Sequence, residues 1–232
     1  MGTPRRILIH GASGRMGRAL LRLCATDANC HVVAAVSRKP AQRVIEGIPQ
    51  FGSAELRGSP AFDVAIDFSL AEAFDPILAL CVARGAALVS GTTGLDTAQL
   101  AALDAAAQRI PLVWAANFSL GVAVLTDLVT RAARALPGWQ CDILEQHHAH
   151  KQDAPSGTAL ALGEAAGQAR YNAIRAGDIV GEHTVQFTTA GERLELTHRA
   201  GDRDIFAAGA LHAATRLVGR APGRYQLREL LD

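Results

Sequence analysis

The sequence has little of what marks several large classes of protein. Its 232 residues include only four cysteines, whose spacing is not that of a metal site, so reduced thiols in apolar surroundings are expected. The formal net charge is +1, which provides no basic field for nucleic acid. No apolar run reaches the ~18 residues of a membrane helix, and no secretory signal precedes the first strand. We therefore expect a cytoplasmic protein that binds neither nucleic acid nor membrane.

The composition is that of a globular protein with a sizeable core. Hydrophobic residues make up 49% of the chain and charged residues 19%. The length allows one large domain or two modest ones. The partners are therefore expected to be small molecules or other copies of the chain.

A glycine-rich turn follows the first predicted strand, residues 6–10. Gly11 permits a tight turn, Gly14 lets the backbone approach a pyrophosphate, and Gly17 allows the next helix to pack close to the strand. The spacing GxxGxxG departs from the strict GxGxxG, so a tight structural turn is an equal alternative on this motif alone. The residues assigned here to cofactor binding are Gly11, Ala12, Ser13, Gly14, Arg15, Met16 and Gly17.

The second predicted strand, residues 31–36, ends in Ser37, Arg38 and Lys39. Dinucleotide-binding folds usually present a carboxylate to the adenosine ribose at this point, whereas a hydroxyl and two cations suit a 2′-phosphate. The cofactor expected is therefore NADPH, with NADH as the second candidate. A solvated basic turn is the alternative, because Pro40 marks a loop.

Strands and helices then alternate, which predicts a parallel sheet covered on both faces. Ligands of such sheets gather at the carboxyl ends of the strands, where this sequence places Gly, Thr and Asn residues. The predicted strands are residues 64–67, 87–90 and 112–115, and the predicted helices are residues 70–84 and a segment that starts at Thr97.

The pattern changes after Phe118 and indicates a second, mixed domain. The predicted elements are helices at 120–136 and 158–169, a strand at 141–145, a hairpin of 182–190 and 193–200, and a last helix at 206–218 before a polar tail. The fold class is therefore α/β, a Rossmann-like parallel sheet domain plus a smaller α+β domain.

Residues 145–160 concentrate most of the chemistry of the chain. The loop expected after the strand holds His147, His148, His150 and Lys151. Ser156 or Thr158 can cap the Ala- and Leu-rich helix that follows, and the amides of its first turn form an anion site. A lysine, imidazoles and a helix N-terminus together favour a small polyanionic ligand, most plausibly a carboxylate, with a proton donor beside it.

Three simpler interpretations compete for this stretch. Clustered histidines can bind metal, but there is no HExxH spacing and no second Cys or His cluster, so we expect no metal. The cluster can also be a solvated loop without function. The Ser156 helix start can be a cap that needs no ligand.

The stretch HHAHKQDAPSGTAL resembles the signature of the 4-hydroxy-tetrahydrodipicolinate (dihydrodipicolinate) reductases, enzymes of the diaminopimelate route to lysine. The resemblance extends through the glycine loop, SGTTG at 90–94, AANFSLGV at 115–122, and AGDIVGEHT and GERLELTHRA nearer the end. It implies reduction of a cyclic, imine-containing dicarboxylate by NAD(P)H, in a homotetramer. It also implies a discontinuous dinucleotide-binding domain, 1–118 with 205–232, and a substrate-binding and tetramerisation domain at 119–204.

The resemblance assigns a role to individual residues. His147 is the expected proton donor, and Lys151 binds substrate and assists protonation. The other expected substrate-binding residues are His148, Ser156, Gly157 and Thr158. The residues expected near the nicotinamide are Gly91, Thr92, Thr93, Ala115, Ala116, Asn117 and Phe118.

Two other functions stay open at this point: a related NAD(P)-dependent amino-acid dehydrogenase, and a dinucleotide-sensing protein without turnover. The intact His147, His148 and Lys151 cluster argues against the second. The chain also departs from longer family members at 168–175, where they carry an additional glycine- and arginine-containing segment. We expect this short connection to cost only a surface excursion.

Overall fold

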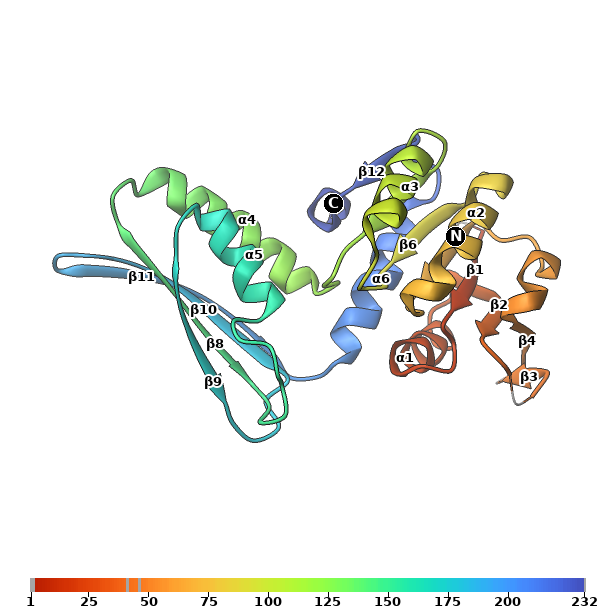
Figure 1. Cartoon of the computed structure of the whole chain (residues 1–232), viewed down its shortest axis with the longest axis horizontal. Helices are drawn as coiled ribbons and strands as arrows, with labels where there is room; N and C mark the ends of the chain where they lie inside the picture. Colours follow the sequence, from red (N-terminus) through yellow and green to blue (C-terminus); the bar gives the residue numbers. More distant parts are fainter. Residues whose placement is uncertain (1–2, 41, 46, 232) are drawn as a thin grey trace. The chain divides into compact units, whose positions relative to one another are not determined.

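The computed structural model describes residues 3–40, 42–45 and 47–231. The chain divides into two compact units (Figure 1), Met1–Phe118 with Phe206–Asp232, and Ser119–Ile205. The outermost positions of the expected first domain, residues 1 and 232, lie outside the described residues. Each unit contains its own sheet.

The larger unit is built on an eight-stranded sheet of order β12-β7-β6-β5-β1-β2-β4-β3, counted over the described residues. All neighbouring pairs are parallel except β3 with β4. The strands are β1 (Arg5–His10), β2 (Cys30–Ser37), β3 (Val44–Ile45), β4 (Ile48–Gly52), β5 (Val64–Asp67), β6 (Ala87–Ser90), β7 (Pro111–Trp114) and β12 (Gly223–Tyr225). The predicted parallel sheet is therefore confirmed.

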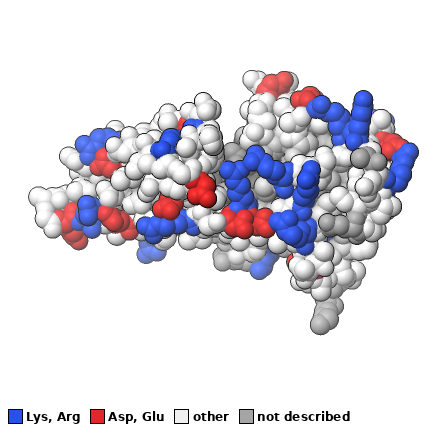
Figure 2. Space-filling model, turned by 90° about the horizontal axis from the view of Figure 1, so that it is seen from below, with Lys and Arg blue, Asp and Glu red and all other residues white. Residues whose placement is uncertain are grey.

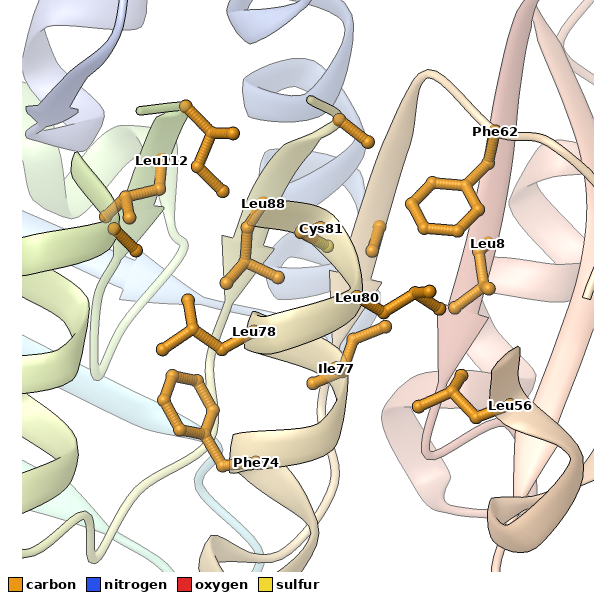
Figure 3. Close-up of a cluster of buried hydrophobic side chains, with 14 of the residues drawn as sticks. Leu8, Leu56, Phe62, Phe74, Ile77, Leu78, Leu80, Cys81, Leu88 and Leu112 are labelled. Atoms are coloured by element: carbon orange, nitrogen blue, oxygen red, sulfur yellow. The ribbon is translucent and has the colours of Figure 1, made fainter. Parts of the chain in front are cut away.

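Helices cover this sheet through side chains that are almost fully buried. They are α1 (Arg15–Cys24), α2 (Phe74–Arg84), α3 (Thr97–Ala107) and α6 (Asp204–Leu217), with short 3₁₀ turns η1 (Ser53–Gly58), η2 (Ala71–Ala73) and η3 (Leu227–Leu230). Figure 3 shows Ile77 and Leu80 of α2 beside Leu8 of β1 in one continuous apolar cluster. Strands β5 and β6 are buried along their whole length, and their largely apolar sequences follow from burial on both faces.

Two predictions about this unit were wrong. The segment called a polar tail forms β12 and η3, because Gly223 to Tyr225 pair with β7 and Leu227 and Leu230 are buried. A three-residue strand is too short to show a periodicity. The helix expected at 70–84 begins at Phe74, and the 3₁₀ turn η2 precedes it.

The smaller unit is a four-stranded sheet of order β11-β10-β8-β9, with two helices. Strands β8, β10 and β11 pair antiparallel, and β9 runs parallel to β8. The elements are α4 (Leu120–Ala135), β8 (Gln140–His147), α5 (Gly157–Ala166), β9 (Arg170–Arg175), β10 (Gly181–Thr189) and β11 (Glu192–Ala200). The hairpin predicted from alternation is confirmed as β10 and β11.

Alternation along the strands divides the sheet into an apolar face and a polar one. Ile143 of β8 and Val185 and Phe187 of β10 pack with Leu125 of α4 and Leu162 of α5. The opposite face carries three cross-strand polar pairs: Thr184 with Thr197, Gln186 with Glu195, and Arg199 with Glu182. The helices of the chain itself therefore cover Val185 and Phe187 of the hairpin, whereas Leu194 stays exposed.

Residues 168–175 were described as a short connection, and the structure shows that most of them form a strand of the smaller sheet. Arg170–Arg175 form the edge strand β9, paired with β8 from Asp142 to His147. Its Tyr171 ring packs on Gly163 of α5, where an added Cβ would lie 1.9 Å from the Tyr171 hydroxyl oxygen. Five of its six residues are exposed, so the hydrophobic pattern gave no signal.

Replacing Gly17 by alanine tests the packing of α1 on the turn after β1. An added Cβ would lie 2.4 Å from the Gly11 carbonyl oxygen, so the backbone must shift. We expect a loss of about 1–3 kcal/mol in the free energy of unfolding, measured by urea denaturation. Gly58→Ala is the control, because nothing lies within 4 Å of its added Cβ. An equal loss in both variants would contradict the packing argument.

Candidate functional site

The glycine loop joins β1 to α1 at the carboxyl edge of the parallel sheet. Gly11 has φ of +81°, and an added Cβ there would lie 2.3 Å from the Phe68 carbonyl oxygen after β5. Gly14 is the N-cap of α1, and the first turn carries no acidic residue. Ser13, Gly14 and Arg15 are exposed, whereas Ala12 and Gly17 are buried. The exposed helix start next to the turn where strand order reverses is a setting that suits a pyrophosphate.

The end of β2 places the three residues predicted to recognise a 2′-phosphate. Ser37 is buried, and Arg38 and Lys39 are exposed. The Arg38 guanidinium is 2.7 Å from Glu72, and both side chains are about two thirds exposed, at 69% and 68%. An exposed ion pair of this kind contributes little to stability, so a phosphate can displace Glu72 at small cost.

A buried polar network lies under the loops that follow β1, β5 and β6. His10 Nδ1 is 2.8 Å from Asp67 Oδ1, and both side chains are almost fully buried. The hydroxyls of Ser90 and Thr92 each donate to Asp67 Oδ2 at 2.8 Å. Burial acts to raise the pKa of Asp67, but the His10 contact and the donors together hold it below its ordinary value.

The same network fixes the loops expected to face the nicotinamide. Trp114 donates its indole N–H to the Thr92 carbonyl at 2.8 Å. Gly91 leaves room for the Phe68 ring, which meets Phe118 edge-on with centroids 5.6 Å apart. Phe118 is 1% exposed and lies within this wall. Thr93 and Ala116 are exposed, and Ala115 and Asn117 are half-buried.

A second polar cluster continues the apolar face of the smaller sheet. The inner face of β8 reads Cys141, Ile143, Glu145 and His147, all buried. Glu145 is 0% exposed, and its Oε2 contacts His147 Nδ1, a pair that becomes a salt bridge when His147 is protonated. Its Oε1 accepts from Arg175 at 2.7 Å and from the Ser156 amide at 3.3 Å. These donors hold the pKa of Glu145 below its ordinary value, although burial opposes them.

The first turn of α5 and strand β10 complete this cluster. Ser156 is the N-cap, and its Oγ accepts from the Ala159 amide at 3.2 Å. The same Oγ lies 3.2 Å from His183 Nε2. Burial, followed by the charge of His147, lowers the pKa of His183 to about 4, so His183 is neutral near pH 7. Of the two predicted caps, Ser156 is therefore the one that caps the helix.

The loop between β8 and α5 holds Lys151, half-buried, with its Nζ 2.7 Å from Asp153 Oδ1. His148 is half-buried and His150 exposed, with ring centroids 6.5 Å apart. His147 was expected in this loop but is the last residue of β8, which extends two residues past the predicted end. Burial, as the largest effect, lowers the pKa of His147.

One group of metal-type side chains occurs among the described residues. Glu145, His147 and His183 bring one ligand atom each within 4.8 Å of one another. The Glu145 carboxylate is engaged by the Arg175 guanidinium and by His147, so a cation would have to displace a positive group already in place. This arrangement fits a hydrogen-bonded acid and base better than a metal centre.

Sequence reasoning missed the residues that support the two clusters: His10, Asp67 and Ser90 in the larger unit, and Glu145, Asp153, Arg175 and His183 in the smaller. One signal was available. Glu145 and His147 stand two apart in a strand, which places both on one face. No comparable signal marked Arg175, because its strand was not recognised.

Comparison with known proteins agrees with this geometry. The family model for the N-terminus of dihydrodipicolinate reductase matches residues 5–118, and the model for its C-terminus matches residues 121–231. The chain belongs to the dihydrodipicolinate reductase family. It is 68% identical to a 4-hydroxy-tetrahydrodipicolinate reductase of Xanthomonas campestris pv. campestris, over 99% of this chain and 98% of the relative. Identity to the Xanthomonas axonopodis pv. citri protein of that name is 69%, over 97% of each chain.

A solved structure shows the same fold. The dipicolinate-bound dihydrodipicolinate reductase of Paenisporosarcina sp. TG-14 has a TM-score of 0.86 at 21% identity, covering 99% of this chain and 100% of that one. The two alternatives, an amino-acid dehydrogenase and a non-catalytic sensor, are not favoured by the family match over both halves of the chain.

The surface agrees with the near-zero net charge. On the face drawn in Figure 2, basic and acidic side chains are interspersed among uncharged ones. Among the described helices, none has both the length and the apolar character needed to cross a membrane.

The buried His10–Asp67 pair predicts a dependence of stability on pH. The pKa of Asp67 is lowered on folding, so its stabilisation is present above the unfolded pKa and is lost as pH falls through the folded one. Asp67→Asn should lower the free energy of unfolding by about 3 kcal/mol or more at pH 7, and by less in acid. Asp104→Asn, which breaks the exposed pair with Arg224, is the control and should cost less than about 1 kcal/mol. Equal losses by urea denaturation would contradict this account.

Proposed function

We propose that this chain reduces 4-hydroxy-tetrahydrodipicolinate (dihydrodipicolinate) to tetrahydrodipicolinate with NAD(P)H, in the diaminopimelate route to lysine. The family match along both halves of the chain carries the proposal. The buried Glu145–His147 pair next to Lys151 supplies the acid and the cation that the reaction needs.

The larger unit fits a dinucleotide. The glycine loop, Gly11 to Gly17, would hold the pyrophosphate, since an added Cβ at Gly11 or Gly17 would meet backbone and the start of α1 carries no acidic residue. Gly91 to Thr93 and Ala115 to Phe118 would line the nicotinamide end. When bound, the cofactor supplies the hydride.

The smaller unit would bind the dicarboxylate substrate. Lys151 is the cation for one carboxylate, in exchange for Asp153, and His148 with the amides of Gly157 and Thr158 receives carboxylate oxygens at the start of α5. The 4-hydroxy compound loses water to give dihydrodipicolinate, whose conjugated ring then gains a hydride and one proton, and His147 delivers that proton. A bound dicarboxylate raises the pKa of His147, which burial otherwise lowers, and so favours the protonated acid.

A coupled assay tests the activity directly. Dihydrodipicolinate synthase supplies fresh substrate, and NADPH oxidation is followed by the nicotinamide absorbance. We expect oxidation that depends on the synthase product. Absence of that oxidation, with cofactor binding intact, would instead favour the sensor. NADPH oxidation with a keto acid and ammonia would favour the dehydrogenase.

His147→Gln should reduce turnover roughly 10²-fold or more with cofactor binding unchanged, as expected for loss of a general acid. Lys151→Ala should lower turnover and weaken substrate binding together, because the substrate loses a charge partner. His150→Gln, an exposed neighbour in the same loop, is the control. Near-normal turnover in His147→Gln with none in Lys151→Ala would make the lysine or a bound water the acid.

Cofactor preference is proposed to favour NADPH. Arg38→Ala should weaken NADPH binding by about 1–3 kcal/mol and leave NADH nearly unchanged. Glu72→Gln should tighten NADPH modestly, because Glu72 competes for Arg38. Titration calorimetry measures each, and Arg43→Ala, whose guanidinium pairs with Glu55, is the control. Equal losses for both cofactors in Arg38→Ala would show that Arg38 contacts the adenine or stabilises the fold, and does not bind the 2′-phosphate.

We further propose a cytoplasmic homotetramer formed through the smaller unit. The family resemblance supports this assembly, together with Ile174 and Leu194, which stay 48% and 38% exposed on the sheet strands. A light-scattering mass of one chain at micromolar concentration would exclude it.

A further inference from the structure

We propose that Glu145 is a positioning residue that fixes the tautomer and orientation of His147, with Arg175 as its counter-ion. The proposal rests on the proposed function, because it assumes that His147 delivers the proton. An ionised carboxylate only accepts hydrogen bonds, so His147 Nδ1 carries the hydrogen in this pair. The other ring nitrogen, Nε2, is then the atom that exchanges a proton with substrate.

Strand register brings these groups together. Glu145 lies opposite His183 of β10, and His147 lies opposite Arg175 of β9. Directly opposed residues share a face, so all four side chains stand on the inner face. Gly181, the next β10 position on this face, leaves room for the imidazole: an added Cβ would lie 3.1 Å from His147 Nε2.

Two hydrogen bonds from Arg175 join edge strand β9 to strand β8 and to the loop between β8 and α5. The Arg175 Nη2 donates to Glu145 Oε1 at 2.7 Å and to the Asp153 carbonyl oxygen at 2.6 Å. Arg175 thus neutralises a buried carboxylate and anchors the loop that contains Lys151. Without Arg175 and His147, burying the Glu145 carboxylate would cost several kcal/mol of folding free energy, because the ion would be uncompensated.

The charges around His147 come from each element packed on it: Glu145 on its own strand, Lys151 on the following loop, Arg175 on β9 and His183 on β10. Burial lowers the pKa of His147 first, Glu145 raises it, and Lys151 and Arg175 lower it further. Removing the Glu145 carboxylate should therefore lower the pKa of His147, and removing the Arg175 charge should raise it.

The pH profile of turnover measures these shifts. Activity requires protonated His147, so it should fall as pH rises through the His147 pKa in the complex. In Glu145→Gln we expect turnover to drop roughly 10- to 100-fold, with the alkaline limb moved to lower pH and cofactor binding unchanged. In Arg175→Gln the limb should move to higher pH, and Arg175→Lys, which keeps the charge, should restore the wild-type position.

A second carboxylate–arginine pair on the same two strands provides the control. Asp142 and Arg170 lie 2.6 Å apart on the opposite, outer face. Asp142→Asn and Arg170→Gln should leave turnover and the pH profile as in the wild type. A loss of activity in Glu145→Gln without a shift of the limb, or the same shift in Asp142→Asn, would reduce Glu145 to a structural role.

Titration of the His147 ring proton by NMR separates this proposal from the function itself. The resonance is assigned with His147→Gln in protein without substrate. The same opposite shifts in Glu145→Gln and Arg175→Gln would support the positioning role even if the wild type failed the coupled assay. Unshifted titration in both variants would overturn the role even if the wild type turned over.

Discussion

The smaller unit depends on a carboxylate that has no contact with solvent. Glu145 joins β8 to β9 through Arg175, to α5 through the Ser156 amide, and to His147 two residues along its own strand. Without these donors the Glu145 carboxylate would be costly to bury. The geometry of the loop between β8 and α5 is therefore coupled to the ionisation of Glu145. The apolar packing of Ile143 and Val185 sets where strand β8 lies, and the polar end of the same face places Glu145 and His147.

The larger unit meets the same constraint differently. Its central strands β5 and β6 are buried on both faces, and their polar residues, Asp67 and Ser90, stand at the carboxyl ends. There Asp67 is buried and hydrogen-bonded to His10, Ser90 and Thr92. The loops after β1, β5 and β6 are therefore held by one hydrogen-bond network. These loops are thus supported by the buried Asp67 carboxylate and its hydrogen-bond partners as well as by packing.

Patterns over whole elements predicted the fold well, and pairings between distant residues were not predictable. Alternation gave the β10–β11 hairpin, and the glycine spacing gave the strand, turn and helix at Gly11 to Gly17. Edge strand β9 is exposed and β12 is three residues long, so neither carries a hydrophobic period. Arg175 could not be paired with Glu145 until the register of β9 was known.

Candidate residues followed the same division. His147, Lys151 and Ser156 stand in one stretch, where local spacing and the family signature identify them. His183 and Asp67 reach their partners only in the folded structure, at sequence separations of 27 and 57 residues. Burial then changes what such groups do: it lowers the pKa of His183 to about 4, which no sequence pattern indicates.

The ionisation of Glu145 is the most direct test of this account. Carbon-13 NMR of protein labelled at the glutamate carboxyl carbons, with Glu145→Gln to assign the resonance, follows this one group as pH falls. The account predicts that the Glu145 carboxylate stays ionised to lower pH than the exposed glutamates, because Arg175, His147 and the Ser156 amide stabilise the anion. A Glu145 resonance that titrates above the exposed glutamates would show a neutral buried acid and would contradict the account.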